Sequence, residues 1–318
     1  MPPRPATHLA PSGRQVVIQH GDAAVAVVEV GGGLRSYQFG GVDVLDGYAV
    51  GEMCRSGRGQ LLVPWPNRLA DGRYQVDGEA LQLALSEPEH HNAIHGLARF
   101  ANWVVVDEGP GRAVMAHRLH PQPGYPFLVD LSAEYHLDDQ GLAVTMSATN
   151  RGTRPCPWAA GAHPYLRLAT ASGGELVDDL LLTVPAATWL ETDSRGIPTG
   201  RQPVAGSPLD FRSPRLIGQA RLDTAFTDLT RGPDGRAQIS LADPGSPRKV
   251  WLWMDEAFPY LMIFTGDTVA AERRRHGLGV EPMTAAPNAF RSGDGLRTLG
   301  PGQTARSTWG ISLAGWDS

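Results

Sequence analysis

The amino-acid sequence predicts an all-β protein, a large antiparallel β-sandwich with few short helices. Many short runs alternate apolar and polar residues or are rich in β-branched and aromatic residues, as strands are. The 38 Gly and 26 Pro form about a fifth of the 318 residues, against roughly 12% in an average protein. They separate the runs at frequent turns. We find no long segment with helix caps and a 3.6-residue period.

The clearest strand pattern covers residues 142–149, where Leu142, Val144 and Met146 fall on one face. The other expected strands cover residues 15–19, 24–30, 249–254, 260–265 and 309–313. Short helices are expected only around residues 213–219 and 270–275. Because no change in composition marks a boundary, we expect residues 1–318 to form one β-sandwich domain.

Composition argues against several classes of partner. A net charge of −5 and a pI near 6.0 do not favour nucleic acid or an anionic membrane. The only dense basic cluster, Arg273–Arg275, is interpreted as a solvated loop. No apolar run has membrane-spanning length, and residues 1–13 lack a signal-peptide core. Cys54 and Cys156 match no zinc or redox motif. We therefore expect buried free thiols and a cytoplasmic location.

The first polar motif is Pro64-Trp65-Pro66-Asn67-Arg68. The two prolines stiffen the backbone that carries Asn67 and Arg68. The planar guanidinium of Arg68 can bridge adjacent sugar hydroxyls or a carboxylate. A structural ion pair with a loop carboxylate remains an alternative for this residue.

Three histidines, His90, His91 and His95, lie close together in the sequence. Adjacent histidines of a strand point to opposite faces, and no metalloprotease-type motif accompanies them, so we predict no metal site. His95 precedes Gly96, which allows a ligand or another chain segment to approach closely. A turn histidine without catalytic function is the alternative.

Two further motifs carry His163 and Glu281. Small residues before His163 leave space beside it, and Pro164 favours an extended backbone there. Trp158 and Tyr165 offer apolar faces to a sugar ring, or are ordinary core residues. Glu281 ends an apolar run before Pro282, and Asp223 lies between apolar positions. Together these groups favour acid–base chemistry on a polyol, although a glycosidase-type pair of Asp223 and Glu281 stays open.

The order of these motifs resembles the aldose 1-epimerase (galactose mutarotase-like) family. The shared series is Asn67-Arg68, His95-Gly96, His163-Pro164-Tyr165, Asp223 and Glu281-Pro282, followed by the C-terminal stretches Pro287–Phe290 and Leu299–Thr304. The resemblance spans about residues 32–313. The chain differs from the well-known galactose-acting members at Leu97, where they usually carry Gly, and at Ala162, where they usually carry Asn. In this it is similar to a divergent bacterial branch, some of whose members are associated with other sugars, including sulfonated glucose.

The resemblance implies a large antiparallel β-sandwich and a cofactor-independent isomerase that interconverts the α and β anomers of a hexose. Glu281 would be the base, His163 the acid and His95 an assisting donor. The residues implied in substrate binding are Arg68, Asp223, Asn67 and Tyr165. We expect a small-molecule sugar as partner, and a monomer or homodimer.

The reaction suits these residue types. A cyclic hemiacetal opens when the C1 hydroxyl loses a proton and the ring oxygen gains one, and after rotation about C1–C2 the ring closes on the other face. We expect an ionised Glu281 and a protonated His163, because their ordinary pKa values are near 4.3 and 6.5, and we expect a bell-shaped pH profile.

Two alternatives keep the scaffold but change the function. The first is a sulfosugar or sugar-phosphate mutarotase, in which Arg99, Arg167 or Arg68 would bind the anionic substituent. The second is a catalytically silent sugar-binding protein, against which the complete His–His–Glu set argues.

Overall fold

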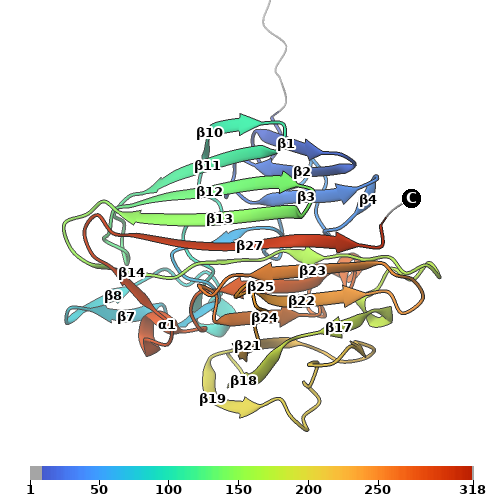
Figure 1. Ribbon diagram of the computed structural model, residues 1–318. Coiled ribbons are helices and arrows are strands. Elements are labelled where there is room, and N and C mark those ends of the chain that lie inside the picture. The colour runs from blue at the N-terminus through green and yellow to red at the C-terminus, as the bar shows by residue number, and fades with distance from the viewer. Residues whose placement is uncertain (1–8, 317–318) are drawn as a thin grey trace, which may run out of the picture.

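The computed structural model describes residues 9–316, whose regular secondary structure is almost entirely antiparallel strands, as the sequence predicts (Figure 1). The largest sheet has nine strands in the order β10-β11-β12-β13-β27-β23-β22-β17-β20. Their bounds are Val104–Gly109, Arg112–Leu119, Val129–Asp138, Gly141–Asn150, Thr304–Ala314, Lys249–Met254, Ala237–Ala242, Leu181–Thr183 and Arg215–Leu216.

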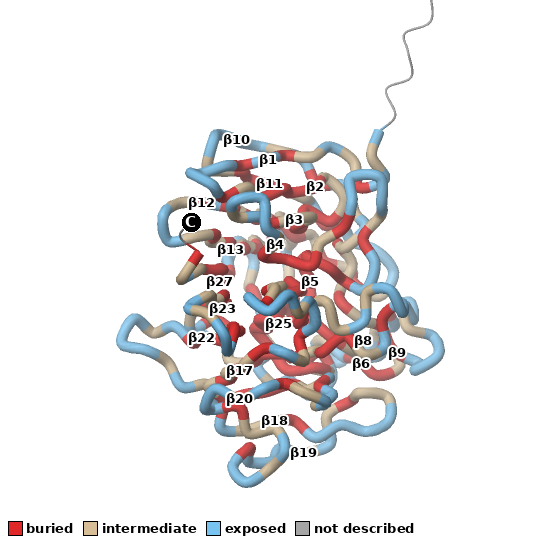
Figure 2. Tube along the Cα trace, turned by 90° about the vertical axis from the view of Figure 1, so that its right-hand side faces the viewer, coloured by how far each residue is buried: buried red, intermediate tan, exposed pale blue. Residues whose placement is uncertain are grey.

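A second sheet of eight strands carries much of the site described below. Its order is β19-β18-β21-β24-β25-β15-β5, with β16 also paired to β25. The bounds are Pro198–Pro203, Ala186–Thr192, Asp223–Leu229, Tyr260–Phe264, Leu278–Met283, Gly161–Ala162, Leu61–Leu62 and, for β16, Tyr165–Leu166. Figure 2 shows that β5 and β25 lie in the buried interior of the molecule, and every residue of both strands is buried.

The remaining elements are smaller. A four-stranded sheet contains β1 (Gln15–His20), β2 (Ala23–Val28), β3 (Leu34–Phe39) and β4 (Val42–Asp43). Three two-stranded sheets pair β6 (Arg68–Ala70) with β9 (Asn92–Ile94), β7 (Arg73–Val76) with β8 (Glu79–Gln82), and β14 (Cys156–Trp158) with β26 (Arg297–Leu299). The helices are the short α1 (Ala289–Ser292) and the 3₁₀ turns η1 (Pro88–His90), η2 (Val177–Asp179) and η3 (Ala271–Arg273).

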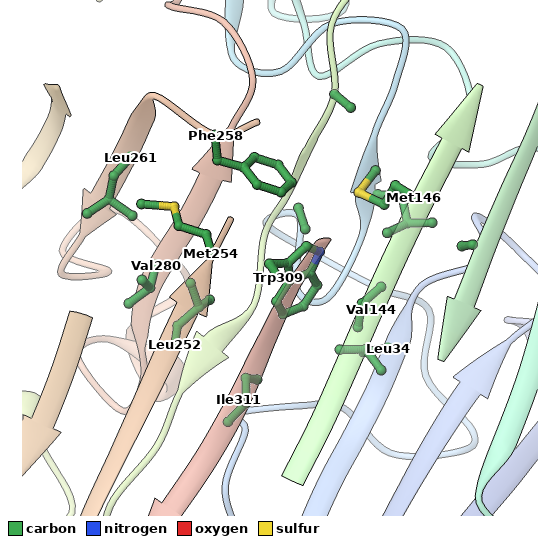
Figure 3. Close-up of a cluster of buried hydrophobic side chains, with 14 of the residues drawn as sticks. Leu34, Val144, Met146, Leu252, Met254, Phe258, Leu261, Val280, Trp309 and Ile311 are labelled. Atoms are coloured by element: carbon green, nitrogen blue, oxygen red, sulfur yellow. The ribbon is translucent and has the colours of Figure 1, made fainter. Parts of the chain in front are cut away.

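The core lies between the nine-stranded sheet and the other large sheets (Figure 3). Along β13, alternate residues are buried, which confirms the predicted apolar face of Leu142, Val144 and Met146. Burying each such side chain stabilises the fold by about 1.5–3 kcal/mol. Trp309 of β27 and Leu261 of β24 both belong to this core. The packing fixes the position of β24 and β25, and hence of the side chains that β25 directs into the site.

All six segments expected to form strands contain one. The expectation of a helix around residues 213–219 is wrong, because Arg215–Leu216 forms β20 and pairs with β17. Pairing in a sheet has overridden the local preference there. The segment 270–275 contains only the 3₁₀ turn η3. Cys54 and Cys156 are buried free thiols. Among the described residues, no helix is long and apolar enough to cross a membrane.

The interpretation of Arg273–Arg275 as a solvated loop holds only for Arg274, which is exposed. Arg273 donates to Asp46, and Arg275 forms ion pairs with Asp178 and Asp267. These side chains therefore fasten the loop between β24 and β25 to the rest of the molecule.

Candidate active site

One cavity of about 570 Å³ brings the predicted site residues together. Its lining includes all seven of them: Asn67, Arg68, His95, His163, Tyr165, Asp223 and Glu281. They come from segments that are up to about two hundred residues apart in the sequence. Arg99 also lines this cavity, whereas Arg167 does not and instead forms ion pairs with Asp43 and Glu175.

Glu281 lies near the end of β25, opposite Met262 of β24. Its residue is only 2% exposed, and Oε2 has no hydrogen-bond partner among the described residues. Burial raises the pKa of Glu281 well above its usual range, and the nearby Asp223 adds to the effect while Arg68 opposes it. A buried carboxyl oxygen without a partner is free to receive a hydrogen bond from a ligand.

His163 lies between β15 and β16, beside Glu281. The Val280 N–H donates to the Pro164 carbonyl at 3.0 Å, which aligns the two segments. His163 Nε2 is 3.3 Å from Glu281 Oε1. A Cβ on Gly57 would lie 2.6 Å from His163 Cδ2, so the imidazole fits only because residue 57 is a glycine. Burial lowers the pKa of His163 to about 3, and the Arg99 and Arg58 cations contribute.

His95 presents a defined hydrogen-bond donor to the cavity. The Asn67 backbone N–H donates to His95 Nδ1 at 3.1 Å, so Nδ1 is the unprotonated ring atom and Nε2 carries the hydrogen of the neutral ring. Gly96 follows with φ of 73°, and a Cβ there would lie 2.0 Å from the Val63 carbonyl oxygen. Burial lowers the pKa of His95 well below its usual range, and His163, Arg99 and Arg68 add to this.

Burial acts against the expected ionised Glu281 and protonated His163. Removal from water disfavours both charged forms, because it raises the pKa of Glu281 and lowers the pKa of His163. The sequence alone does not show this burial. Acid–base catalysis requires one proton for the two groups, and that count is the same whether the carboxyl group or the imidazole holds it.

Arg68 both forms an ion pair with a loop carboxylate and faces the cavity, which are the two alternatives that the sequence left open. Its Nε lies 2.9 Å from Glu87 Oε2, and its Nη1 lies 3.9 Å from Asp223 Oδ2, while the guanidinium lines the cavity. The ion pair holds the guanidinium in place beside the cavity. Sequence reasoning missed Glu87, although Glu87-Pro88 repeats the Glu-Pro pattern of positions 281 and 282. Phe100, which is 60% exposed, is a further missed residue of the lining.

The arrangement of His95, His163 and Glu281 also bears on metal binding. One possible ligand atom from each lies within 4.8 Å of the others. A metal on His95 Nε2 needs the lone pair of that atom, and the hydrogen would then move to Nδ1, facing the Asn67 N–H. The donor set present therefore fits a polar ligand with hydroxyl groups better than it fits a metal ion.

Comparisons with known proteins place this geometry in a family. The model of the aldose 1-epimerase family matches residues 14–312. The chain belongs to the aldose 1-epimerase family. It is 30% identical to the uncharacterized protein YihR of Escherichia coli over 306 residues, which are 96% of this chain and 95% of YihR. It is 31% identical to human galactose mutarotase over 157 residues, 48% of this chain and 44% of that protein.

Solved structures agree with the fold. The GalM/aldose epimerase homologue of Caenorhabditis elegans superposes with a TM-score of 0.84 at 17% identity, covering 96% of this chain and 99% of that one. A galactose mutarotase-like protein of Clostridium acetobutylicum gives 0.82 at 18% identity, covering 95% of each. At these identities the likeness shows the fold alone. It is the galactose mutarotase-like β-sandwich that the resemblance implied.

Proposed function

We propose that this member of the aldose 1-epimerase family is a mutarotase that interconverts the α and β anomers of a hexose. The observation that carries the proposal is the contact of 3.3 Å between His163 Nε2 and Glu281 Oε1 inside the cavity. Two groups that share one proton can remove a proton from one oxygen of a hemiacetal and deliver one to the other.

The ring opens in one balanced step. Glu281, ionised in the complex, takes the proton of the C1 hydroxyl, the bond from C1 to the ring oxygen breaks, and His163 gives its proton to the ring oxygen. The pair is then neutral. After rotation about C1–C2 the same transfers run in reverse and close the ring. Each positioned transfer contributes about 10² to 10⁴ in rate.

Binding of the sugar makes the ionised form of Glu281 accessible. A sugar hydroxyl that donates to Oε2 supplies the hydrogen bond that this atom lacks, and such bonds favour the carboxylate. The proton then moves across the 3.3 Å contact to His163. His95 donates from Nε2 to a sugar oxygen, while Arg68, Asp223, Asn67 and Tyr165 hold the remaining parts of the sugar.

Polarimetry tests the proposal directly. We expect the purified protein to accelerate the change in optical rotation of at least one freshly dissolved single-anomer hexose from a panel. Glu281→Gln should lower the rate by about 10² to 10⁴-fold. Glu134→Gln, the same exchange at a partly exposed carboxylate of β12 that does not line the cavity, is the control. Full activity of Glu281→Gln would contradict the assignment, and sugar binding without acceleration by the wild type would favour the silent binding protein.

A second candidate function is mutarotation of a hexose that carries an anionic substituent, such as a sulfonate or phosphate. Arg99 lines the cavity and forms no salt bridge with any carboxylate of the described residues. Its guanidinium contacts Gln60 Oε1 and the Ile94 carbonyl only at 3.5 and 3.4 Å. A half-buried cation with such weak contacts can bind an anion.

The substituent of the sugar separates these two candidates. If Arg99 binds an anionic group, Arg99→Gln should raise KM for a sulfonated or phosphorylated hexose about tenfold or more, and KM for the neutral hexose should change less than about twofold. Arg167→Gln, at an arginine outside the cavity lining, is the matched control. An equal effect of Arg99→Gln on both sugars would favour the neutral hexose.

A further inference from the structure

His163 is in contact with an aromatic ring that is itself held by a buried cation. The imidazole and the Tyr165 ring stack with centroids 4.9 Å apart and planes inclined by only 7°. The Arg58 guanidinium carbon lies 4.6 Å from the centroid of the same Tyr165 ring. Tyr165 is 2% exposed, and its hydroxyl donates to the Ser56 carbonyl at 2.8 Å. The tyrosine ring is thus fixed at its face and at its hydroxyl end.

Arg58 is itself fixed by a carboxylate. Its Nε and Nη2 lie 3.0 and 2.9 Å from Asp46 Oδ2, and the side chains of Arg58 and Asp46 are 6% and 0% exposed. Arg273, from the loop between β24 and β25, donates from Nη1 to Asp46 Oδ1 at 2.8 Å. The planar fork of an arginine that binds a carboxylate through two nitrogens has little rotational freedom.

The backbone joins this ion cluster to the tyrosine. The Asp46 N–H donates to the Tyr165 carbonyl at 2.9 Å. A Cβ on Gly277 would lie 2.6 Å from Asp46 Cβ and 3.1 Å from Tyr165 Cβ, so the three segments approach closely only with glycine at position 277. A movement of Asp46 or Arg58 is therefore transmitted to Tyr165, and through the stacked rings to His163.

We infer that Arg58 and Asp46 are positioning residues for the proposed anomerisation, which hold the His163 imidazole in line with Glu281 through Tyr165. The inference rests on the proposed function for its kinetic consequence. Arg58 is absent from the cavity lining, so it acts on the reaction only through its neighbours. A displacement of about 1 Å in a reacting group costs roughly 10² in rate. Contacts that keep the His163 imidazole in place therefore affect the rate strongly.

Arg58 has an electrostatic effect on His163 as well as a geometric one. Its positive charge adds to burial and to Arg99 in lowering the pKa of His163. The ionisable groups near the imidazole, from every element packed against it, are Glu281, His95, Tyr165, Cys54, Arg58 and Arg99. Two variants at position 58 can therefore separate charge from geometry.

The kinetic experiment compares Arg58→Met with Arg58→Lys in the full chain. We expect Arg58→Met to lower kcat about 10- to 100-fold and to change KM much less, since His163 is misplaced while the sugar contacts of Arg68, Asp223 and Asn67 remain. Arg58→Lys keeps the charge but lacks the planar fork, so its kcat should also be lowered. Its acid limb, which is the fall of kcat/KM at low pH, should stay at the wild-type pH. In Arg58→Met that limb should move to higher pH, because one cation that opposes protonation of His163 is gone.

Arg154→Met is the matched control. Arg154 also lies over an aromatic ring, 4.7 Å from the Phe127 centroid, and pairs with Glu79 at 2.9 Å, but it does not line the cavity. It should leave kcat and the pH profile unchanged. A kcat of Arg58→Met within twofold of the wild type, or an equal loss in Arg154→Met, would overturn the inference.

A measurement without substrate separates this inference from the proposed function. The imidazole resonances of His163, followed by NMR against pH, should titrate with a midpoint near 3 in the wild type and at higher pH in Arg58→Met. The His163 shifts at pH 7 should also differ between the two proteins, because ring stacking changes. Unaltered His163 resonances would overturn the positioning role. Absence of mutarotation by the wild type, together with altered resonances, would contradict only the proposed function.

Discussion

Two neighbouring clusters of polar side chains, each with a buried carboxyl group at its centre, meet at Tyr165 and differ in how completely that group is paired. In the ion cluster of Asp46, Arg58 and Arg273, both oxygens of the carboxylate accept from guanidinium groups. In the acid–base cluster of His95, His163 and Glu281, the carboxyl oxygen Oε2 has no partner among the described residues. Asp46 and Glu281 are each only 2% exposed, so the difference does not come from the burial of the carboxyl group.

The comparison teaches which cluster supports the fold and which awaits a ligand. When any partner of a fully paired buried carboxylate is removed, the free energy of unfolding falls, because the remaining charges stay buried. An unpaired buried carboxyl group already destabilises the folded state, and evolution retains such a group where a ligand completes its hydrogen bonds. The two clusters should therefore respond to neutral substitutions with opposite signs.

The largest expected effect on stability is in the ion cluster. Asp46→Asn removes the negative charge between Arg58 and Arg273 and leaves two cations facing a neutral amide, so the free energy of unfolding should fall by about 3 kcal/mol. Urea denaturation at pH 7 measures this value. Glu108→Gln, which removes an exposed ion pair with Arg14, should cost less than about 1 kcal/mol. A loss at Asp46 as small as that at Glu108 would remove the distinction between the clusters.

The acid–base cluster should respond in the opposite direction, with a dependence on pH. Glu281 has a raised pKa in the folded state, so its stabilising contribution is complete below its unfolded pKa near 4.3 and is lost as pH rises toward the folded pKa. The amide that replaces this carboxyl group in Glu281→Gln does not titrate. Above pH 4.3, the difference in the free energy of unfolding between the variant and the wild type should therefore rise in favour of the variant, by at most about 1.4 kcal/mol per pH unit.

Denaturation curves at several pH values between 4 and 8 test this trend. Glu108→Gln should show a much flatter difference, because the Glu108 carboxyl group lies at the surface in an exposed ion pair with Arg14. If Glu281→Gln were less stable than the wild type at pH 7, Glu281 would be an ionised and stably paired group, and the contrast with Asp46 would disappear.

The sequence predicted six of the strands and a set of polar residues that line one cavity, and the reason is local. Alternation along residues 142–149 reports a buried face directly, and motifs such as His163-Pro164 and Glu281-Pro282 carry their chemistry in adjacent positions. The short β20 was missed because two residues gain their strand conformation only from pairing with β17. A pairing partner is not visible in a two-residue segment.

The ion cluster and the protonation of the site were beyond the sequence for a different reason. Asp46 and Arg273 are 227 positions apart, and neither stands in a motif that points to the other. The pKa values of His163 and Glu281 depend on removal from water, which is produced by the packing of whole sheets around β25. Ordinary pKa values assigned residue by residue therefore miss the direction in which burial shifts the pKa of each group.

The smallest expected effect concerns metal ions, and it tests which kind of ligand the acid–base cluster binds. The Asn67 N–H donates to His95 Nδ1 and so holds His95 in the tautomer whose Nε2 is a donor. A metal bound to Nε2 would move the hydrogen to Nδ1, so that two N–H groups would face each other in place of the hydrogen bond, at a cost of about 1–3 kcal/mol. Dialysis against EDTA should therefore leave the rate of anomerisation unchanged, with zinc-saturated EDTA as the control. Loss of activity that one equivalent of Zn²⁺ restores would show instead that His95, His163 and Glu281 act together as metal ligands, and the cluster would then be completed by a cation rather than by the hydroxyl groups of a sugar.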